Sequence, residues 1–248
     1  MPELRTVLAG LALVGIAGHA SAQDAAEFDW SGPYIGAYVA MSSFGVDISD
    51  ANNQFTNDAP SLTETMGSGG IYAGLNWQLA DISDVVLGLE VDFGSDLSQT
   101  EFFSTNAAGS NGYEYDLRLT TIGSISARAG LPSGRTLFYV IGGFSQTDVE
   151  MQTYQVDSAA GFTDCGNSTC AESSEPIIGL NLGVGLDYAA AENVVVRFDI
   201  RHFAFDTLTA DVRNSAGDPA CASGTVGACT VSYDPSVTQV RLGLAYKF

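Results

Sequence analysis

The sequence predicts an all-β fold, an eight-stranded antiparallel up-and-down transmembrane β-barrel, and three observations predict it. Eight segments alternate bulky apolar residues with polar or small ones, and a period of two is the side-chain period of a strand. Long polar connections alternate along the chain with short turns. Beyond the N-terminal apolar run, no stretch holds the about 20 consecutive apolar residues that a membrane helix needs.

The N-terminus predicts a signal peptide over residues 1–22. A basic residue precedes the apolar run 8–18, and an Ala-x-Ala cleavage signal ends at Ala22, so the mature chain is expected to start at Gln23. The alternative is a short membrane anchor, but the run is short and ends in small residues. Residues 23–32 are then expected to form a short periplasmic lead.

The barrel is predicted to occupy residues 33–248. Each of its eight segments has about 10 residues or more, enough for a tilted membrane strand. The segments are 33–43, 69–80, 84–95, 113–130, 135–147, 176–190, 193–206 and 236–248. Long polar stretches, predicted to be external loops, lie near 44–68, 96–112, 148–175 and 207–235. Short turns, predicted to be periplasmic, lie at 81–83, 131–134 and 190–192. Outer-membrane barrels show this alternation of long external loops and short periplasmic turns.

The composition of the two strand faces indicates which one meets lipid. A soluble barrel would bury the apolar phase and expose a phase rich in Lys, Glu and Thr. Here the phase opposite to the apolar one is rich in glycine and carries few charges of both signs. Glycine and sparse paired charges suit a crowded lumen, so the apolar phase is predicted to face lipid.

Charged side chains on the glycine-bearing phase are predicted to meet inside the barrel. An eight-stranded interior is just wide enough for side chains, and a buried unpaired charge costs several kcal/mol, so these charges must pair. The predicted lumenal charge network is Glu90, Asp92, Arg118, Arg128, Asp187, Arg197, Asp199, Arg201, Arg241 and Lys247. A narrow ion-selective channel through this network is the alternative to a closed interior.

Charge and cysteine usage exclude several classes. The formal net charge of −20 argues against nucleic-acid binding, which needs basic patches. The four cysteines form two close pairs, and an oxidising compartment favours the local disulfides Cys165–Cys170 and Cys221–Cys229, although four cysteines allow three connectivities. A zinc site is weaker, because the spacing is wrong and no histidine is near. No cofactor or metal residue is expected, and the acidic loops are expected to attract cations at most.

The aromatic residues and the histidine give weaker expectations. Aromatic residues flank the segments and are predicted to lie in the membrane–water girdle, namely Trp30, Tyr34, Trp77, Tyr188 and Tyr246. A lipid-modifying enzyme usually needs a histidine as general base. After cleavage only His202 remains, on an apolar phase and without a serine two residues away. No catalytic residue is therefore predicted, and the chain is expected not to be an enzyme.

Three stretches carry a recognisable pattern, namely FDWSGPYIGAYVA (28–40), SISARAGLPSGRTLFYVIGG (124–143) and VRLGLAYKF (240–248). They resemble the small eight-stranded outer-membrane barrels of Gram-negative bacteria, known as porin-family or OmpA-like barrels. One departure is Ser126, where that family often has arginine.

The resemblance implies a cell outer-membrane location and a structural or surface role, with a small ion or solute diffusion channel as the alternative. It also implies outer-membrane lipid and lipopolysaccharide as partners, and the barrel-insertion machinery during biogenesis. The insertion signal would consist of the alternate residues of the last strand, Val240, Leu242, Leu244, Tyr246 and Phe248.

Overall fold

The computed structural model describes residues 28–49, 61–79, 85–96, 100–105, 111–157, 170–219 and 229–248. The predicted signal peptide and the predicted turn at 81–83 lie outside them. The described residues form strands and no helix. None of their segments is a helix long and apolar enough to cross a membrane.

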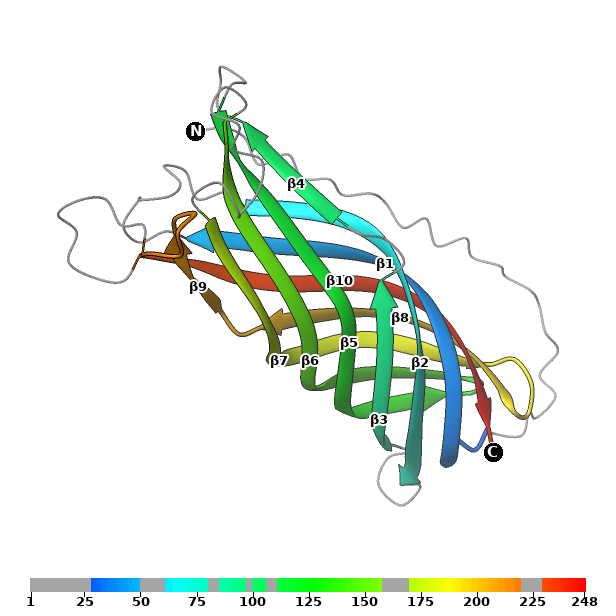
Figure 1. Ribbon diagram of the computed structural model, residues 1–248. Helices are drawn as coiled ribbons and strands as arrows, with labels where there is room; N and C mark the ends of the chain where they lie inside the picture. Colours follow the sequence, from blue (N-terminus) through cyan, green and yellow to red (C-terminus); the bar gives the residue numbers. More distant parts are fainter. Residues whose placement is uncertain are drawn as a thin grey trace, which may run out of the picture.

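Figure 1 shows the strands in chain order. They are β1 (Gly32–Ser49), β2 (Ser61–Leu79), β3 (Val85–Asp96), β4 (Thr100–Thr105), β5 (Asn111–Ser133), β6 (Thr136–Asp157), β7 (Cys170–Ala189), β8 (Val194–Phe205), β9 (Leu208–Arg213) and β10 (Thr230–Lys247).

Eight of these strands close into a barrel. The order around the wall is β1-β2-β3-β5-β6-β7-β8-β10, and β10 pairs antiparallel with β1, from Tyr34 opposite Lys247 to Ser49 opposite Ser232. All neighbours are antiparallel, which confirms the predicted eight-stranded barrel. Closure pairs the backbone of the first and last strands, as hydrocarbon demands of a spanning sheet.

The two remaining strands prolong members of the barrel. β4 pairs with β5 up to Leu117, directly beyond the β3–β5 pairs, which end at Thr121. β9 pairs with β10 up to Tyr233, directly beyond the β8–β10 pairs, which begin at Ser236. β4 therefore continues β3, and β9 continues β8, above the membrane.

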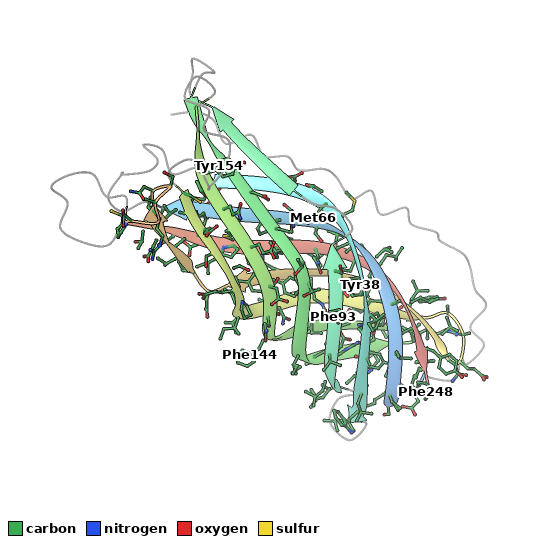
Figure 2. All side chains as sticks on the ribbon, in the orientation of Figure 1. Tyr38, Met66, Phe93, Phe144, Tyr154 and Phe248 are labelled. Carbon is green, nitrogen blue, oxygen red and sulfur yellow. The ribbon has the colours of Figure 1, made fainter. Side chains whose placement is uncertain are left out.

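A belt of exposed apolar side chains surrounds the lower part of the wall. Figure 2 shows one of them, Phe144, pointing away from the barrel. On β7 the belt runs from Ile178 to Tyr188, with exposed Leu180, Leu182 and Val184 between them. Ten residues of strand cover roughly 33 Å, which at a tilt of about 40° spans an apolar band of roughly 25 Å. The predicted lipid-facing phase is thus the exposed phase of the wall.

The strands are longer than predicted, and the predicted loop limits are wrong. β6 has 22 residues, whereas the sequence predicted 135–147, and parts of 44–68, 96–112, 148–175 and 207–235 are strand. The reason is that the apolar phase changes sides where a strand leaves the membrane. On β1, Val39 and Met41 are exposed, whereas Phe44 and Val46 are buried inside. Read as one continuous alternation, this change looks like the end of a strand.

The interior is filled in three layers. The external apolar cluster lies above the belt, and the periplasmic cluster lies near the short turns. Between them, at mid-height, lies the charged layer, which consists of Glu90, Asp92, Arg128, Asp187, Arg197, Asp199, Arg201 and Arg241. The external apolar cluster is Phe44, Val46, Ile48, Met66, Leu119, Ile122, Val149, Met151, Ala171, Ile177, Phe203, Phe205, Leu208, Ala210, Val212, Cys229, Val231, Tyr233 and Val237. The periplasmic cluster is Trp30, Tyr34, Tyr38, Ala40, Tyr72, Val86, Leu137, Ala189, Val195 and Ala245.

Candidate functional site in the barrel lumen

The charged layer is built by side chains from five strands. Residues two apart on a strand share a face, so β8 alone directs three charged residues, Arg197, Asp199 and Arg201, into the lumen. Strand register then sets the partners. Arg197 lies opposite Asp187 of β7, and Asp199 lies opposite Arg241 of β10.

Glu90 of β3 lies at the centre of the network. Its Oε2 accepts a hydrogen bond from Arg197 Nη1 at 2.6 Å and one from the Tyr34 hydroxyl at 2.7 Å. Its Oε1 accepts one from Arg201 Nη2, and Arg128 Nη1 lies 3.7 Å from Oε2. With its side chain fully buried, this single carboxylate thus faces three guanidinium groups.

The other three carboxylates each contact two arginines. Asp187 accepts from Arg128 Nη2 at 2.6 Å and from Arg197 Nε at 2.8 Å. Asp92 accepts from Arg201 Nη1 at 2.9 Å and from Arg241 Nη2 at 3.2 Å.

Asp199 Oδ1 completes the set, 3.3 Å from Arg201 Nε and 3.7 Å from Arg241 Nε. Four carboxylates therefore face four guanidinium groups, so the formal charges of the layer cancel. Buried charges that lack such partners would carry a large desolvation penalty.

Three tyrosine rings contact the guanidinium groups of the network, and the sequence analysis did not predict these contacts. The guanidinium carbons lie over the rings, Arg128 at 4.0 Å from the Tyr139 centroid and Arg197 at 4.3 Å from that of Tyr72. Arg241 lies 3.9 Å from the centroid of Tyr38. Such cation–π contacts strengthen when the cation is removed from water.

Glycines on the inward phase leave room for these aromatic rings. A Cβ at Gly36 would lie 2.5 Å from Tyr72 Cζ, and one at Gly70 would lie 2.6 Å from the Tyr38 hydroxyl. The alternation of tyrosine with glycine on neighbouring strands was the signal that could have placed these tyrosines inside.

Arg118 is not part of the network, and the prediction was wrong for it. Between Leu119 and Ile122, β5 has two residues where β6 has one, a bulge that reverses the phase of the strand above it. Leu119 therefore points inward and Arg118 outward. Its Nη1 lies 3.7 Å from Glu150 Oε2, with side chains 40% and 55% exposed.

Lys247 is also outside the network. It lies on the inward phase, but it is the last residue of β10, at the periplasmic rim of the barrel, where its side chain is only half-buried. Its Nζ lies 5.5 Å from the ring centroid of Phe28, and no carboxylate of the described residues pairs with it.

The predicted aromatic girdle divides in two. Trp77, Tyr188 and Tyr246 are exposed on the outer wall, as expected. Trp30 and Tyr34 are buried inside. Tyr34 lies on the inward phase of β1, whereas Trp30 belongs to the lead, which enters the barrel mouth before β1 begins.

The last residues of the periplasmic lead seal this mouth. Trp30 is 1% exposed, its backbone nitrogen donates to Gln78 Oε1 at 3.0 Å, and the ring of Phe28 packs edge-on at 4.7 Å. Gly32 makes the turn into β1 with φ of 117°, which favours glycine.

The external apolar cluster contains one buried polar contact between opposite walls. The hydroxyls of Thr153 on β6 and Tyr233 on β10 lie 2.7 Å apart. Burial raises the pKa of Tyr233 to about 12, although the Thr153 hydrogen bond opposes this. The folded external part of the barrel therefore favours the neutral phenol of Tyr233 over the phenolate.

The remaining predicted residues lie outside the charged layer. Cys170 and Cys229 are both disulfide-bonded, while Cys165 and Cys221 lie outside the described residues, so the predicted pairing stays a prediction. The ring of His202 is exposed on the outer wall, with Nδ1 3.0 Å from Thr238 Oγ1. The described part of the chain holds no group of three metal-ligating side chains.

The predicted insertion-signal residues all face outward. Val240, Leu242, Leu244, Tyr246 and Phe248 are exposed on β10 and just beyond it, with the rings of Tyr246 and Phe248 5.0 Å apart. They form part of the apolar belt at the strand that closes the barrel.

A protein-family comparison matches nearly the whole chain. The family described as "Outer membrane protein beta-barrel domain" matches residues 9–248. No curated protein sequence matches the chain.

Solved structures of low identity are similar to this chain over most of its length. Neisserial surface protein A is 13% identical with a TM-score of 0.40, covering 86% of this chain and 97% of its own. OprG from Pseudomonas aeruginosa is 13% identical with a TM-score of 0.49, covering 88% and 96%. The outer membrane protease OmpT from Escherichia coli is 9% identical with a TM-score of 0.46, covering 91% and 99%.

Proposed function

Because this chain belongs to the family of outer membrane protein β-barrel domains, we propose that it is a non-conducting, non-enzymatic barrel with a structural and surface role. In this role the apolar belt anchors the protein in the outer membrane. The external part of the strands, with its own apolar core, presents the acidic loops outside the cell. Loops positioned by a rigid scaffold are where binding functions concentrate.

The observation that carries this proposal is the filling of the lumen at three heights. Trp30 and Leu137 fill the periplasmic mouth, the paired charges fill the middle, and residues such as Phe203 and Tyr233 fill the external part. Both of the last two side chains are 0% exposed. A hydrated ion would have to displace an apolar layer at each end as well as the ion pairs between them.

The same charges support a non-enzymatic role. Each buried carboxylate is bound by at least two arginines, so none is free to act as a general base. His202, the one histidine in the described part of the chain, contacts a threonine and no carboxylate. General acid–base chemistry needs a titratable group within reach of a substrate proton.

One observation favours the alternative of a narrow channel. Asp199 Oδ1, Arg201 Nε and both Nε and Nη1 of Arg241 are buried without a hydrogen-bond partner, and such atoms usually bind water. Water in the charged layer would supply part of a conducting path.

Conductance in planar bilayers decides between the two. The purified protein is expected to give no discrete openings, and Trp30→Ala, which empties the periplasmic mouth, is expected to give none either while the external apolar cluster stays closed. Discrete openings of the unchanged protein, with an ion selectivity that Arg241→Gln alters, would establish the channel instead.

We also propose that divalent cations connect the external surface to lipopolysaccharide. Carboxylates such as Asp148, Glu175, Asp206 and Asp234 are exposed just above the belt. Like charges repel the lipid phosphates unless a cation lies between them. Lipopolysaccharide binding to the detergent-folded protein should therefore require Mg²⁺, and binding that is equal in EDTA would contradict this.

A further inference from the structure

A groove crosses the outer wall in the periplasmic half of the belt. It has a volume of about 540 Å³ and extends over the adjacent strands β5, β6, β7 and β8, which Figure 1 shows side by side, and Val85 of β3 also lines it. Pockets of this size accommodate small-molecule ligands. The groove is separate from the lumen and belongs to the lipid-facing surface.

Small and large residues next to one another create the groove. Its floor is formed by the small side chain of Ala129 and by the backbone of Gly130 and Gly185, whose Cβ positions point into the lumen. Its walls include Leu131 and Phe138, which are 61% and 55% exposed. The groove is therefore a depression between bulky belt residues, lined by apolar groups.

The position of the groove assigns it to the inner leaflet. Leu131 pairs with Phe138 close to the two-residue turn of Gly134 and Arg135, where β5 and β6 meet at the periplasmic end. The polar surface of the membrane on this side therefore lies only a few residues from the groove.

Arg135 places a positive charge at the membrane-surface end of the groove. Its Nε donates to the backbone oxygen of Ala189 at 2.7 Å, which fixes the exposed side chain across the end of β7. Within the described residues no carboxylate pairs with it, so both Nη atoms stay available. A guanidinium with two free nitrogens binds a phosphate through two parallel hydrogen bonds.

We propose that this groove binds one phospholipid of the inner leaflet, with an acyl chain along Ala129 and the phosphate on Arg135. The hydrophobic effect does not drive this binding, because lipid tails are as apolar as the groove itself. The driving forces are packing contacts, which an unfilled groove would lose, and the ion pair at the headgroup. A flexible acyl chain can adapt its shape to this apolar depression.

The experiment compares matched variants of the full chain. Ala129→Phe fills the groove from its floor, whereas Ala127→Phe puts the same ring on the same exposed phase of β5, outside the groove. Each protein is folded in detergent, checked by heat-modifiable gel mobility and incubated with phosphatidylglycerol or with diacylglycerol, which lacks the phosphate. Native mass spectrometry then counts the lipid molecules that each protein retains.

The unchanged protein and Ala127→Phe are expected to retain one phosphatidylglycerol, and Ala129→Phe is expected to lose it. Arg135→Gln, and diacylglycerol with the unchanged protein, should each lower the apparent affinity at least tenfold, because each removes the charge-assisted hydrogen bonds between the guanidinium and the phosphate. If Ala129→Phe does not fold, Val184→Trp fills the same groove from β7. The proposal is overturned if no lipid is retained, if the two phenylalanine variants behave alike, or if removing the phosphate changes nothing.

Lipid binding in the groove is independent of whether the lumen conducts, because the groove lies on the other side of the wall. A conducting protein that still retains the lipid would contradict the proposed function alone.

Discussion

At the scale of single residues, Glu90 shows how the lumen depends on complete pairing. One buried carboxylate faces Arg128, Arg197 and Arg201, so its charge offsets part of three others. Replacing a whole buried network by apolar residues is often tolerated, whereas removing one partner leaves uncompensated charge. The arginines therefore depend on Glu90 more than any single distance suggests.

Glu90→Gln is expected to lower the free energy of unfolding by about 3–5 kcal/mol, because it leaves an excess of buried positive charge. Urea unfolding of the detergent-folded protein, followed by heat-modifiable mobility, measures this loss. Arg118→Gln is the control. It removes an exposed ion pair, which should cost no more than about 1 kcal/mol. Equal losses in the two variants would contradict the structure of the lumen.

Tyr233 predicts a pH dependence of the external part. Because burial raises its pKa to about 12, above the ordinary value of about 10, the folded state favours the neutral phenol. The raised pKa contributes about 3 kcal/mol to the free energy of unfolding. This contribution is fully present below pH 10 and is lost as the pH rises to about 12. Tyr233→Phe should reduce the loss of stability between pH 9 and about 12 in urea unfolding. Tyr188→Phe, on an exposed ring, should leave it unchanged.

Residue positions in the lumen were predictable from the sequence as far as one strand phase could be followed. The alternation of β8 places Arg197, Asp199 and Arg201 together without any knowledge of the fold. Arg118 could not be placed, because the bulge in β5 is a property of its pairing with β6 rather than of the local sequence. The lumenal position of Trp30 depends equally on tertiary packing, since nothing in the lead itself shows that it enters the barrel.

At the scale of elements, each strand has two parts with opposite polarity. In the membrane the apolar side chains face out, and above it they face in. The change is visible in the sequence as an odd spacing between apolar residues, such as Met41 to Phe44 on β1 and Val237 to Val240 on β10. A strict period of two ends a predicted strand at this point, which explains why every predicted loop was too long.

This division predicts that the same substitution by lysine has different effects on stability at two heights of one strand. Leu182→Lys, on the exposed phase of β7 in the middle of the belt, should destabilise the folded protein by about 2–4 kcal/mol. Ser174→Lys lies on the same strand and phase but above the belt, where the exposed surface is polar, so its effect should be within about 0.5 kcal/mol. Urea unfolding in lipid bilayers measures both. A similar cost at the two positions would place the membrane boundary elsewhere.

At the scale of the whole molecule, the pairing of β1 with β10 completes the barrel. We propose that the insertion machinery recognises the end of β10 before this closure. Phe248→Ala is therefore expected to reduce the amount of folded protein in the outer membrane several-fold. Phe144→Ala removes an equally exposed belt aromatic away from the last strand and should leave assembly near normal. Cell fractionation with heat-modifiable mobility compares them, and equal yields would argue against a signal in the last strand.

The length of β6 has a consequence for what the cell displays. From Phe144 at the top of the belt to Asp157, this strand continues for about 40 Å, paired with β5 and β7 and supported by a packed interior. Figure 2 shows Tyr154 far from the belt residue Phe144. The external part of the barrel is thus a stiff support. The segment that joins Asp157 to Cys170 can change in evolution without altering the height of this support. A foreign epitope grafted there would stand clear of the lipid surface, within reach of an antibody.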